Sequence, residues 1–294
     1  MTGRHPEAIW CSARGELRVD APVVMGILNL TPDSFSDGGE LRDPEAAVGR
    51  GARMVEEGAH ILDVGGESTR PGARPVDVDE ERRRVVPAVE ALVGALEVPV
   101  SIDTRKADVA RAALQVGAAI VNDVSALSFD PAMAEVVAEA GAGVVLMHMR
   151  GVPSNMQMRT RYRDVAGEVT DELEGAVENA LRAGISRSAI AVDPGIGFAK
   201  TAEQSWELLA RLERLRTLGL PILVGPSRKS FLEVATGAPV QNRAVASAVA
   251  CAMAYRAGAR IFRVHDVAAT IQALSVAVAL ERAGAGSDEP MEVR

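Results

Sequence analysis

Eight short apolar runs recur along the chain, and nearly every one ends at a polar residue of a kind that active sites use. Buried strands are typically continuous runs of Val, Ile and Leu, and their alternation with helical segments indicates parallel βαβ units. The runs are VVMGILN to Asn29, ILDVGGE to Glu67, VPVSID to Asp103, AIVND to Asn122 and Asp123, VVLMH to His148, IAVD to Asp193, PILVGPS to Ser227, and IFRVHD to Arg263, His265 and Asp266. Eight units predict an α/β protein with a closed (β/α)8 TIM barrel, whose active site would lie at the C-terminal strand ends.

The length of 294 residues suits one barrel of about 250 residues with modest extensions. Residues 9–20 (IWCSARGELRVD) predict a hairpin turning at Arg14 and Gly15, which we expect to cover the barrel floor. We therefore divide the chain into an N-terminal extension (1–20), the barrel (21–283) and a flexible C-terminal tail (284–294). Glycines that would end helices before the next strand support the repeat; they are Gly58, Gly117, Gly141, Gly184, Gly219 and Gly258.

The charge balance and composition exclude several classes of protein. Forty acidic and 32 basic residues give a net charge of −8, which argues against nucleic acid as a partner. No signal-peptide pattern opens the chain and no apolar run approaches the roughly 18 residues of a membrane span, so we expect a cytoplasmic protein without a membrane partner. The two cysteines have no CxxC spacing and indicate neither a disulfide nor a zinc site. Only three basic residues are lysines (106, 200 and 229), a hint that a compact ammonium is needed there.

Carboxylates and amides at the predicted strand ends form the first candidate site. Buried charges must be paired, so Asp103, Asp123 and Asp193, with Asn122 among them, predict a metal or a donor-rich ligand. A heterocycle with N–H donors fits better than a metal, because the histidines at strand ends come from well-separated strands. For any single aspartate, a helix N-cap or a loop brace is the alternative.

A basic cluster forms the second candidate site. Arg70 lies in a long loop (68–79), Arg228 and Lys229 precede a helix, and Arg263 with His265 ends the last run. Phosphate sites of barrels often use the loops after strands 7 and 8, and helix N-termini favour anions. Arg228 alone is more typical of a surface ion pair. The long loops 30–43 and 68–79 are candidates for lids or substrate clamps.

Taken together, eight motifs resemble the dihydropteroate synthase family of folate biosynthesis. They are MGILNLTPDSFSDGG (25–39), DVGGESTRPGA (63–73), SIDT (101–104), NDVSA (122–126), LMHM (146–149), DPGIGFAK (193–200), GPSRKSF (225–231) and RVHDV (263–267). The resemblance implies that 4-aminobenzoate displaces diphosphate from 6-hydroxymethyl-7,8-dihydropterin diphosphate, giving 7,8-dihydropteroate. It also implies a homodimer.

The resemblance further implies site residues for each substrate part. The pterin would be held by Asp103, Asn122, Asp193 and Lys229, with Met147, Phe198 and Arg263 against its faces. The diphosphate would contact Thr69, Arg70, Arg263 and His265, and Asn29 would help to hold Mg²⁺ on it. The aminobenzoate would be framed by Phe35, Pro71, Phe198 and Ser230. The residues expected to act in catalysis are Asp103, Lys229, Arg263 and His265.

The chemistry needs no general base, because an arylamine is neutral and nucleophilic at pH 7. Stabilising the leaving group becomes the main task, and a dissociative path with a pterin cation near Asp103 is our hypothesis. Two alternatives remain: a pterin-dependent methyltransferase barrel, and a catalytically silent paralogue. One departure from the family is Ala126 where Gly is common, which matters only if the backbone needs positive φ. Glu67 receives no chemical role.

Overall fold

The computed structural model describes residues 9–31, 43–70 and 72–284. Its strands are β1 (Ile9–Ser12), β2 (Gly15–Arg18), β3 (Val23–Asn29), β4 (Ile61–Gly65), β5 (Val100–Asp103), β6 (Ile120–Asp123), β7 (Gly143–Met147), β8 (Ile190–Asp193), β9 (Leu223–Val224) and β10 (Ile261–Val264). Its α-helices are α1 (Pro44–Glu56), α2 (Val78–Ala95), α3 (Ala107–Gln115), α4 (Met133–Ala140), α5 (Val165–Arg182), α6 (Ala202–Ala210), α7 (Ser230–Thr236), α8 (Ala244–Arg256) and α9 (Val267–Gly284).

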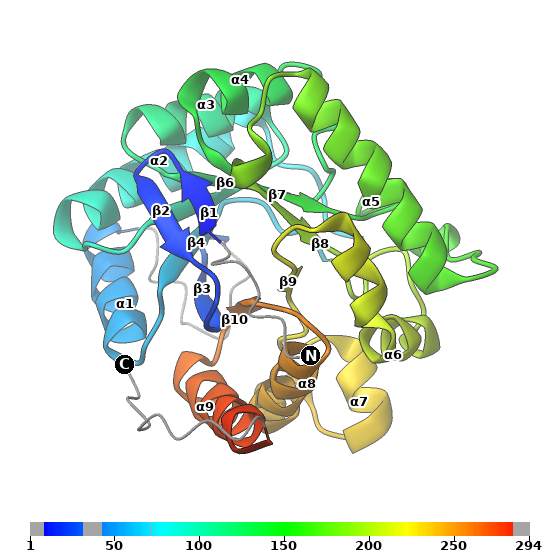
Figure 1. Cartoon of the computed structure of the whole chain (residues 1–294). Helices are drawn as coiled ribbons and strands as arrows, with labels where there is room; N and C mark the ends of the chain where they lie inside the picture. Colours follow the sequence, from blue (N-terminus) through cyan, green and yellow to red (C-terminus); the bar gives the residue numbers. More distant parts are fainter. Residues whose placement is uncertain (1–8, 32–42, 71, 285–294) are drawn as a thin grey trace.

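The eight predicted apolar runs form one parallel sheet that curls into a barrel, with the helices around it (Figure 1). Neighbouring strands follow the order β8-β7-β6-β5-β4-β3-β10-β9. A parallel bridge between Val192 and Ile222 joins the two ends of the sheet. The bridge is short because prolines flank β9 at Pro221 and Pro226, and proline cannot donate to a strand ladder. The (β/α)8 prediction is confirmed.

The N-terminal hairpin closes one end of the barrel. Strands β1 and β2 pair antiparallel, with Ser12 opposite Gly15 and the turn at residues 13–14. Trp10 is fully buried, and its indole N–H donates to the Ala189 carbonyl at 2.8 Å. Around Trp10 the barrel interior is apolar, with Val23, Met25, Ile61, Ile120, Val145, Ala191, Leu223 and Ile261 in one cluster. Among the described residues, the polar groups Asp103, Asn122 and Asp193 lie at the opposite end, where the strands finish.

Helix boundaries follow local chemistry where the sequence predicts them. The Asp43 side chain accepts from the Glu45 N–H at 3.1 Å and Pro44 opens α1, so the N-terminus of α1 is capped by the residue types that favour this position. All six glycines that were predicted to end helices have positive φ. Gly141, for example, is the left-handed residue that ends α4.

By length and composition, α9 could cross a membrane: it has 18 residues and a mean hydropathy of 1.2. The expectation that no segment approaches a span was therefore wrong for this helix. Its apolar character has a local explanation, because α9 is the last barrel helix and packs against α8 and β3. Val267, Leu274 and Ala277 are its buried apolar residues.

Candidate active site

The carboxyl ends of the strands bring the predicted carboxylates and amides to one end of the barrel. Asp103 ends β5 and lies in register with Asn122 of β6. Asp193 ends β8 and lies in register with Met147, the last residue of β7. Arg263 is the third residue of β10. Each is carried by a strand buried on both faces, so the rigid barrel sets their relative positions.

Arg263 links these strands through two ion pairs. Its Nε donates to Asp63 Oδ2 at 2.6 Å, and its Nη2 donates to Asp103 Oδ2 at 2.6 Å. Asn122 Nδ2 also donates to Asp63 Oδ2, at 3.2 Å. Asp63 is fully buried, and its Oδ1 has no partner among the described residues. The sequence interpretation missed Asp63, although an acidic residue inside an apolar strand was the available signal.

The electrostatics of this group follow from its burial. Desolvation raises the pKa of Asp103 to about 7, against the lowering effect of the Arg263 charge. Desolvation alone would lower the pKa of Arg263, but Asp63, Asp103 and Asp193 outweigh it and keep the guanidinium charged. The Arg263 cation thus lies among the side chains of Asp63, Asp103 and Asp193. A ligand could take the place of one of these partners.

Lys229 and Phe198 form the other wall of the predicted pterin pocket. The Lys229 ammonium lies 4.4 Å from the centre of the Phe198 ring and donates to the Ile196 carbonyl. Burial lowers the pKa of Lys229 to about 8, while nearby Asp193 opposes this shift. Burial raises the pKa of Asp193, whose Oδ1 accepts from the Gly195 N–H at 2.7 Å. Asp193, Phe198 and Lys229 are therefore brought together as predicted.

A buried lysine behind this wall was not part of the predicted site. Lys200 donates to His148 Nδ1 at 3.0 Å, to the Gly195 carbonyl at 3.1 Å and to the Phe198 carbonyl at 2.9 Å. On its other side, His148 Nε2 lies 2.9 Å from Glu172. Burial lowers the pKa of Lys200 to about 7. The histidine is thus a support for the loop after β8 and not a rim ligand.

The predicted anion cluster gathers around His265. Its backbone N–H donates to Ser227 Oγ at 3.1 Å, and that oxygen lies 3.1 Å from the ring Nδ1. Burial, together with the charges of Arg228, Arg263 and Arg70, lowers the pKa of His265 to about 3. His265 is therefore a neutral group surrounded by arginines. Arg228 itself forms an ion pair with Asp266 at 2.6 Å, in line with the surface ion pair that the sequence suggested.

The remaining predicted residues occupy separate places at the same end. Ser230 is exposed and begins α7, and Thr69 lies in the loop after β4 (loop 2, residues 66–77). Asn29 ends β3 and lies in register with Gly65. Phe35 and Pro71 lie outside the described residues. The described ranges contain no cluster of three or more His, Cys, Asp or Glu residues able to hold a metal ion by themselves.

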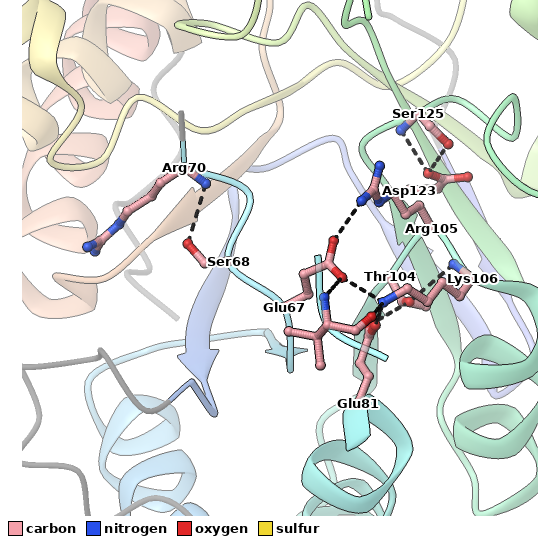
Figure 2. Close-up of polar contacts among 10 residues, drawn as sticks. Glu67, Ser68, Arg70, Glu81, Thr104, Arg105, Lys106, Asp123 and Ser125 are labelled. Carbon is pink, nitrogen blue, oxygen red and sulfur yellow. Dashed lines mark hydrogen bonds and ion pairs between the residues drawn. The ribbon is translucent and has the colours of Figure 1, made fainter. Parts of the chain in front are cut away.

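Two residues that end predicted runs have structural roles. Asp123 accepts from the Ser125 N–H at 2.7 Å and from the Ser125 hydroxyl at 2.6 Å (Figure 2). It also accepts from the Leu127 N–H at 2.9 Å. It is therefore the loop brace that the sequence left open as an alternative. Inside this braced turn Ala126 has φ 50° and Leu127 has φ 65°, so the backbone does need the conformation that glycine favours.

Glu67 lies just after β4 and is buried in a cluster of charges (Figure 2). It pairs with Arg105 at 2.9 Å and with Lys106 at 2.6 Å. The cluster borders the predicted pterin pocket, because Glu67, Thr69 and Asp103 line one small cavity.

Buried carboxylates next to a cationic rim, at the strand ends of a barrel, define an enzyme class that binds a donor-rich, anionic small molecule. Residues 25–265 match the family described as pterin binding enzyme. The dihydropteroate synthase of Mycobacterium leprae is 51% identical over 272 residues, covering 90% of this chain and 95% of that protein. The Synechocystis sp. dihydropteroate synthase is 49% identical over 260 residues, covering 88% and 90%.

Solved structures agree with these relatives. The Xanthomonas albilineans dihydropteroate synthase with 4-aminobenzoic acid has a TM-score of 0.88 to this chain at 45% identity, covering 94% of this chain and 99% of that one. The chain belongs to the pterin-binding enzymes and, among them, to the dihydropteroate synthase family.

Proposed function

We propose that the barrel mouth condenses 6-hydroxymethyl-7,8-dihydropterin diphosphate with 4-aminobenzoate, releasing diphosphate and giving 7,8-dihydropteroate for folate biosynthesis. The observation that carries this function is the position of β10. Arg263 contacts the buried carboxylates of β4 and β5, and two residues later His265 lies among arginines. A substrate with N–H donors at one end and an anion at the other matches this polarity.

The pterin end is held by the carboxylate group. Asp103 and Asp193 accept from the N–H donors of the pterin, Asn122 supplies a donor and an acceptor, and Lys229 donates to the ring oxygen. Arg263, Phe198 and Met147, the last residue of β7, lie against the faces of the ring. When the ligand enters, the carboxylates exchange part of their pairing with Arg263 for the ligand's donors, so their buried charge stays compensated.

The diphosphate end is held by Thr69, Arg70, Arg263 and His265. Mg²⁺ keeps several waters and commonly binds through substrate phosphates, so one amide oxygen from Asn29 fits a site completed by the diphosphate. When bound, Mg²⁺ would neutralise charge on the leaving diphosphate. The test is the affinity for pterin diphosphate with and without Mg²⁺. Asn29→Ala should remove most of the difference, and an unchanged difference would exclude Asn29 as a ligand.

The aminobenzoate enters above Phe198, and its carboxylate meets the start of α7 at Ser230. No group needs to take a proton from the amine before attack. In our proposal the C–O bond to diphosphate breaks first, and Asp103 stabilises the developing pterin cation while loop closure excludes water. The amine nitrogen then forms the C–N bond and loses its proton to solvent as the product leaves. Positional isotope exchange in pterin diphosphate without aminobenzoate tests this path. An absence of exchange would favour direct displacement.

The overall reaction has its own test. Diphosphate release that depends on both pterin diphosphate and aminobenzoate supports the synthase. Tight pterin binding without release would indicate a silent paralogue, and methyl transfer to a corrinoid would indicate the methyltransferase. The arginines around His265 favour the synthase, because a methyl transfer has no use for a diphosphate site.

We further propose that the enzyme acts in the cytoplasm as a homodimer. Val245, Val249 and Met253 recur every four residues on α8 and are 74%, 55% and 65% exposed. Val276 and Leu280 extend the surface onto adjacent α9 (Figure 1). An apolar face of this kind is covered when two copies pair about a twofold axis.

The dimer is tested by sedimentation of Val249→Glu, which should give monomers. Leu181→Glu on α5 is the control and should leave the mass unchanged. A wild-type protein that sediments as a monomer at micromolar concentration would overturn this part of the proposal.

A further inference from the structure

Four buried charged side chains lie together where loop 2 leaves and rejoins the barrel. Glu67, Glu81, Arg105 and Lys106 form this group, named here the loop-2 clamp, and their side chains are 7%, 1%, 8% and 9% exposed. Two carboxylates balance two cations, as a buried group of charges requires. Figure 2 shows the clamp between the start of α2 and the end of β5.

The clamp holds both ends of loop 2 at one point. Glu67 stands at the start of the loop, and its Oε2 accepts from the backbone N–H of Val76 at 2.9 Å. Lys106 Nζ donates to the Val76 carbonyl at 2.6 Å. Both backbone polar groups of Val76 are therefore satisfied by the clamp, although Val76 lies nine residues beyond Glu67.

Lys106 uses its three ammonium donors on Glu67, Glu81 and the Val76 carbonyl. A planar guanidinium cannot point its donors in three separate directions from one nitrogen, so lysine suits this position. This geometry explains why one of the few lysines in the chain stands at position 106.

The clamp is also fixed to the catalytic strands. The Thr104 hydroxyl, next to Asp103, donates to Glu81 at 2.7 Å. Arg84 donates to the Gly66 carbonyl at 2.9 Å, which holds the first residue of the loop. Burial alone would raise the pKa of Glu67, but the Lys106 and Val76 donors and the Arg105 charge bring it below the usual value. Glu67 therefore remains ionised.

Thr69 and Arg70 lie two and three residues after Glu67. In Figure 2 the Arg70 side chain points away from the clamp, and the Arg70 charge acts on His265. We propose that Glu67 and Lys106 are positioning residues, which set where loop 2 presents Thr69 and Arg70 to the diphosphate; this inference rests on the proposed function. They do not contact the substrate themselves.

Binding measurements with two ligands test this role. Wild-type protein should bind 6-hydroxymethyl-7,8-dihydropterin diphosphate more tightly than 6-hydroxymethyl-7,8-dihydropterin. Glu67→Gln should weaken binding of the diphosphate ligand by about tenfold, because a small displacement of charged contacts is costly, and change binding of the other ligand by less than about twofold. Equal losses for both ligands, or no loss, would overturn the inference.

Val76→Pro provides a second variant that leaves the four charges in place. It removes the N–H from which Glu67 accepts and also fixes φ at residue 76, and it should show the same selective loss. Glu139→Gln is the matched control, because it breaks an exposed ion pair with Arg111 on neighbouring helices. The control should bind both ligands like the wild type.

A double-mutant cycle separates positioning from general weakening. If Glu67 acts through Arg70, then Glu67→Gln should have little further effect in an Arg70→Ala background. Additive losses would overturn the inference. A wild-type protein that gains no affinity from the diphosphate would instead refute the proposed diphosphate site, whatever the variants do.

Discussion

Lys200 Nζ lies 3.0 Å from Nδ1 of His148, so the loop after β8 is joined to the end of β7 by a buried ammonium. The same ammonium donates to the carbonyls of Gly195 and Phe198. Because Nδ1 accepts, the other ring nitrogen carries the proton toward Glu172. The backbone of Phe198, a residue of the proposed pterin pocket, is therefore held by the Lys200 ammonium.

Lys200→Met should lower the free energy of unfolding by about 1–3 kcal/mol, because two buried carbonyls lose their donor. Urea denaturation at neutral pH measures this change. Arg111→Met, at an exposed ion pair, is the control and should change stability by less than about 0.5 kcal/mol. A Lys200→Met protein as stable as the control would show that the ammonium does not support the loop.

The pH dependence of stability gives a second test of Lys200. Its folded pKa of about 7 lies below the usual lysine value, so between the two values the unfolded chain binds more protons. Stability should therefore rise with pH from about 7 to about 9 more steeply in the wild type than in Lys200→Met. Parallel profiles for the two proteins would contradict the lowered pKa.

Asp103 should make pterin binding depend on pH. Its folded pKa is raised to about 7, so its contribution to stability is fully present below the usual aspartate pKa and is lost as pH rises through 7. Pterin affinity should change in the opposite sense, because only the carboxylate accepts two N–H donors. Calorimetric titration from about pH 6 to about pH 8 should show rising affinity, and Asp103→Asn should bind at least about tenfold more weakly with little pH dependence.

Asp63→Asn should lower the free energy of unfolding, because Asp63 is fully buried beside Arg263. It removes one carboxylate partner of Arg263 and leaves a buried cation less compensated, which typically costs about 3 kcal/mol. Urea denaturation should show this loss, and kcat should fall because Arg263 is then ion-paired with Asp103 and no longer with Asp63. Asp20→Asn, at an exposed pair with Arg18, is the control. If both variants were equally stable, Asp63 would not be the anchor of Arg263.

Ala126→Gly should stabilise the protein by about 0.5–1 kcal/mol, because a left-handed backbone is strained for alanine and not for glycine. Leu127→Gly is the contrasting variant: both side chains pack against the core, but Leu127 also has positive φ and loses a whole isobutyl group instead of one methyl, so this variant should be destabilised. Thermal unfolding of both variants measures the difference. Destabilisation by Ala126→Gly would mean that the turn carries no strain.

Much of the architecture was predictable because it depends on local patterns. A strand buried on both faces requires an apolar run, and this chain has eight of them. The hairpin around Trp10 and the cap at Asp43 follow from turn and capping chemistry within a few residues. The polar end of the barrel was predictable for the same reason, since parallel strands finish on one side.

Pairwise contacts were much less predictable. Asp63 and Arg263 are 200 residues apart, and Lys200 and His148 are 52 residues apart. Which residues at the strand ends face the substrate and which brace a loop depends on side-chain direction after the barrel has closed. Asp123 and Asp103 end adjacent strands, yet one braces a turn and the other pairs with Arg263.

The order of apolar runs and polar ends established the barrel, its active end and the kinds of groups gathered there, because strand burial and strand direction depend on neighbouring residues in the chain. The partners of Arg263, the burial that moves the pKa of Asp103, and the role of Glu67 were decided by the tertiary structure. Desolvation and ion pairing depend on which distant residues closure brings within about 3 Å of each other, and no local pattern records that distance.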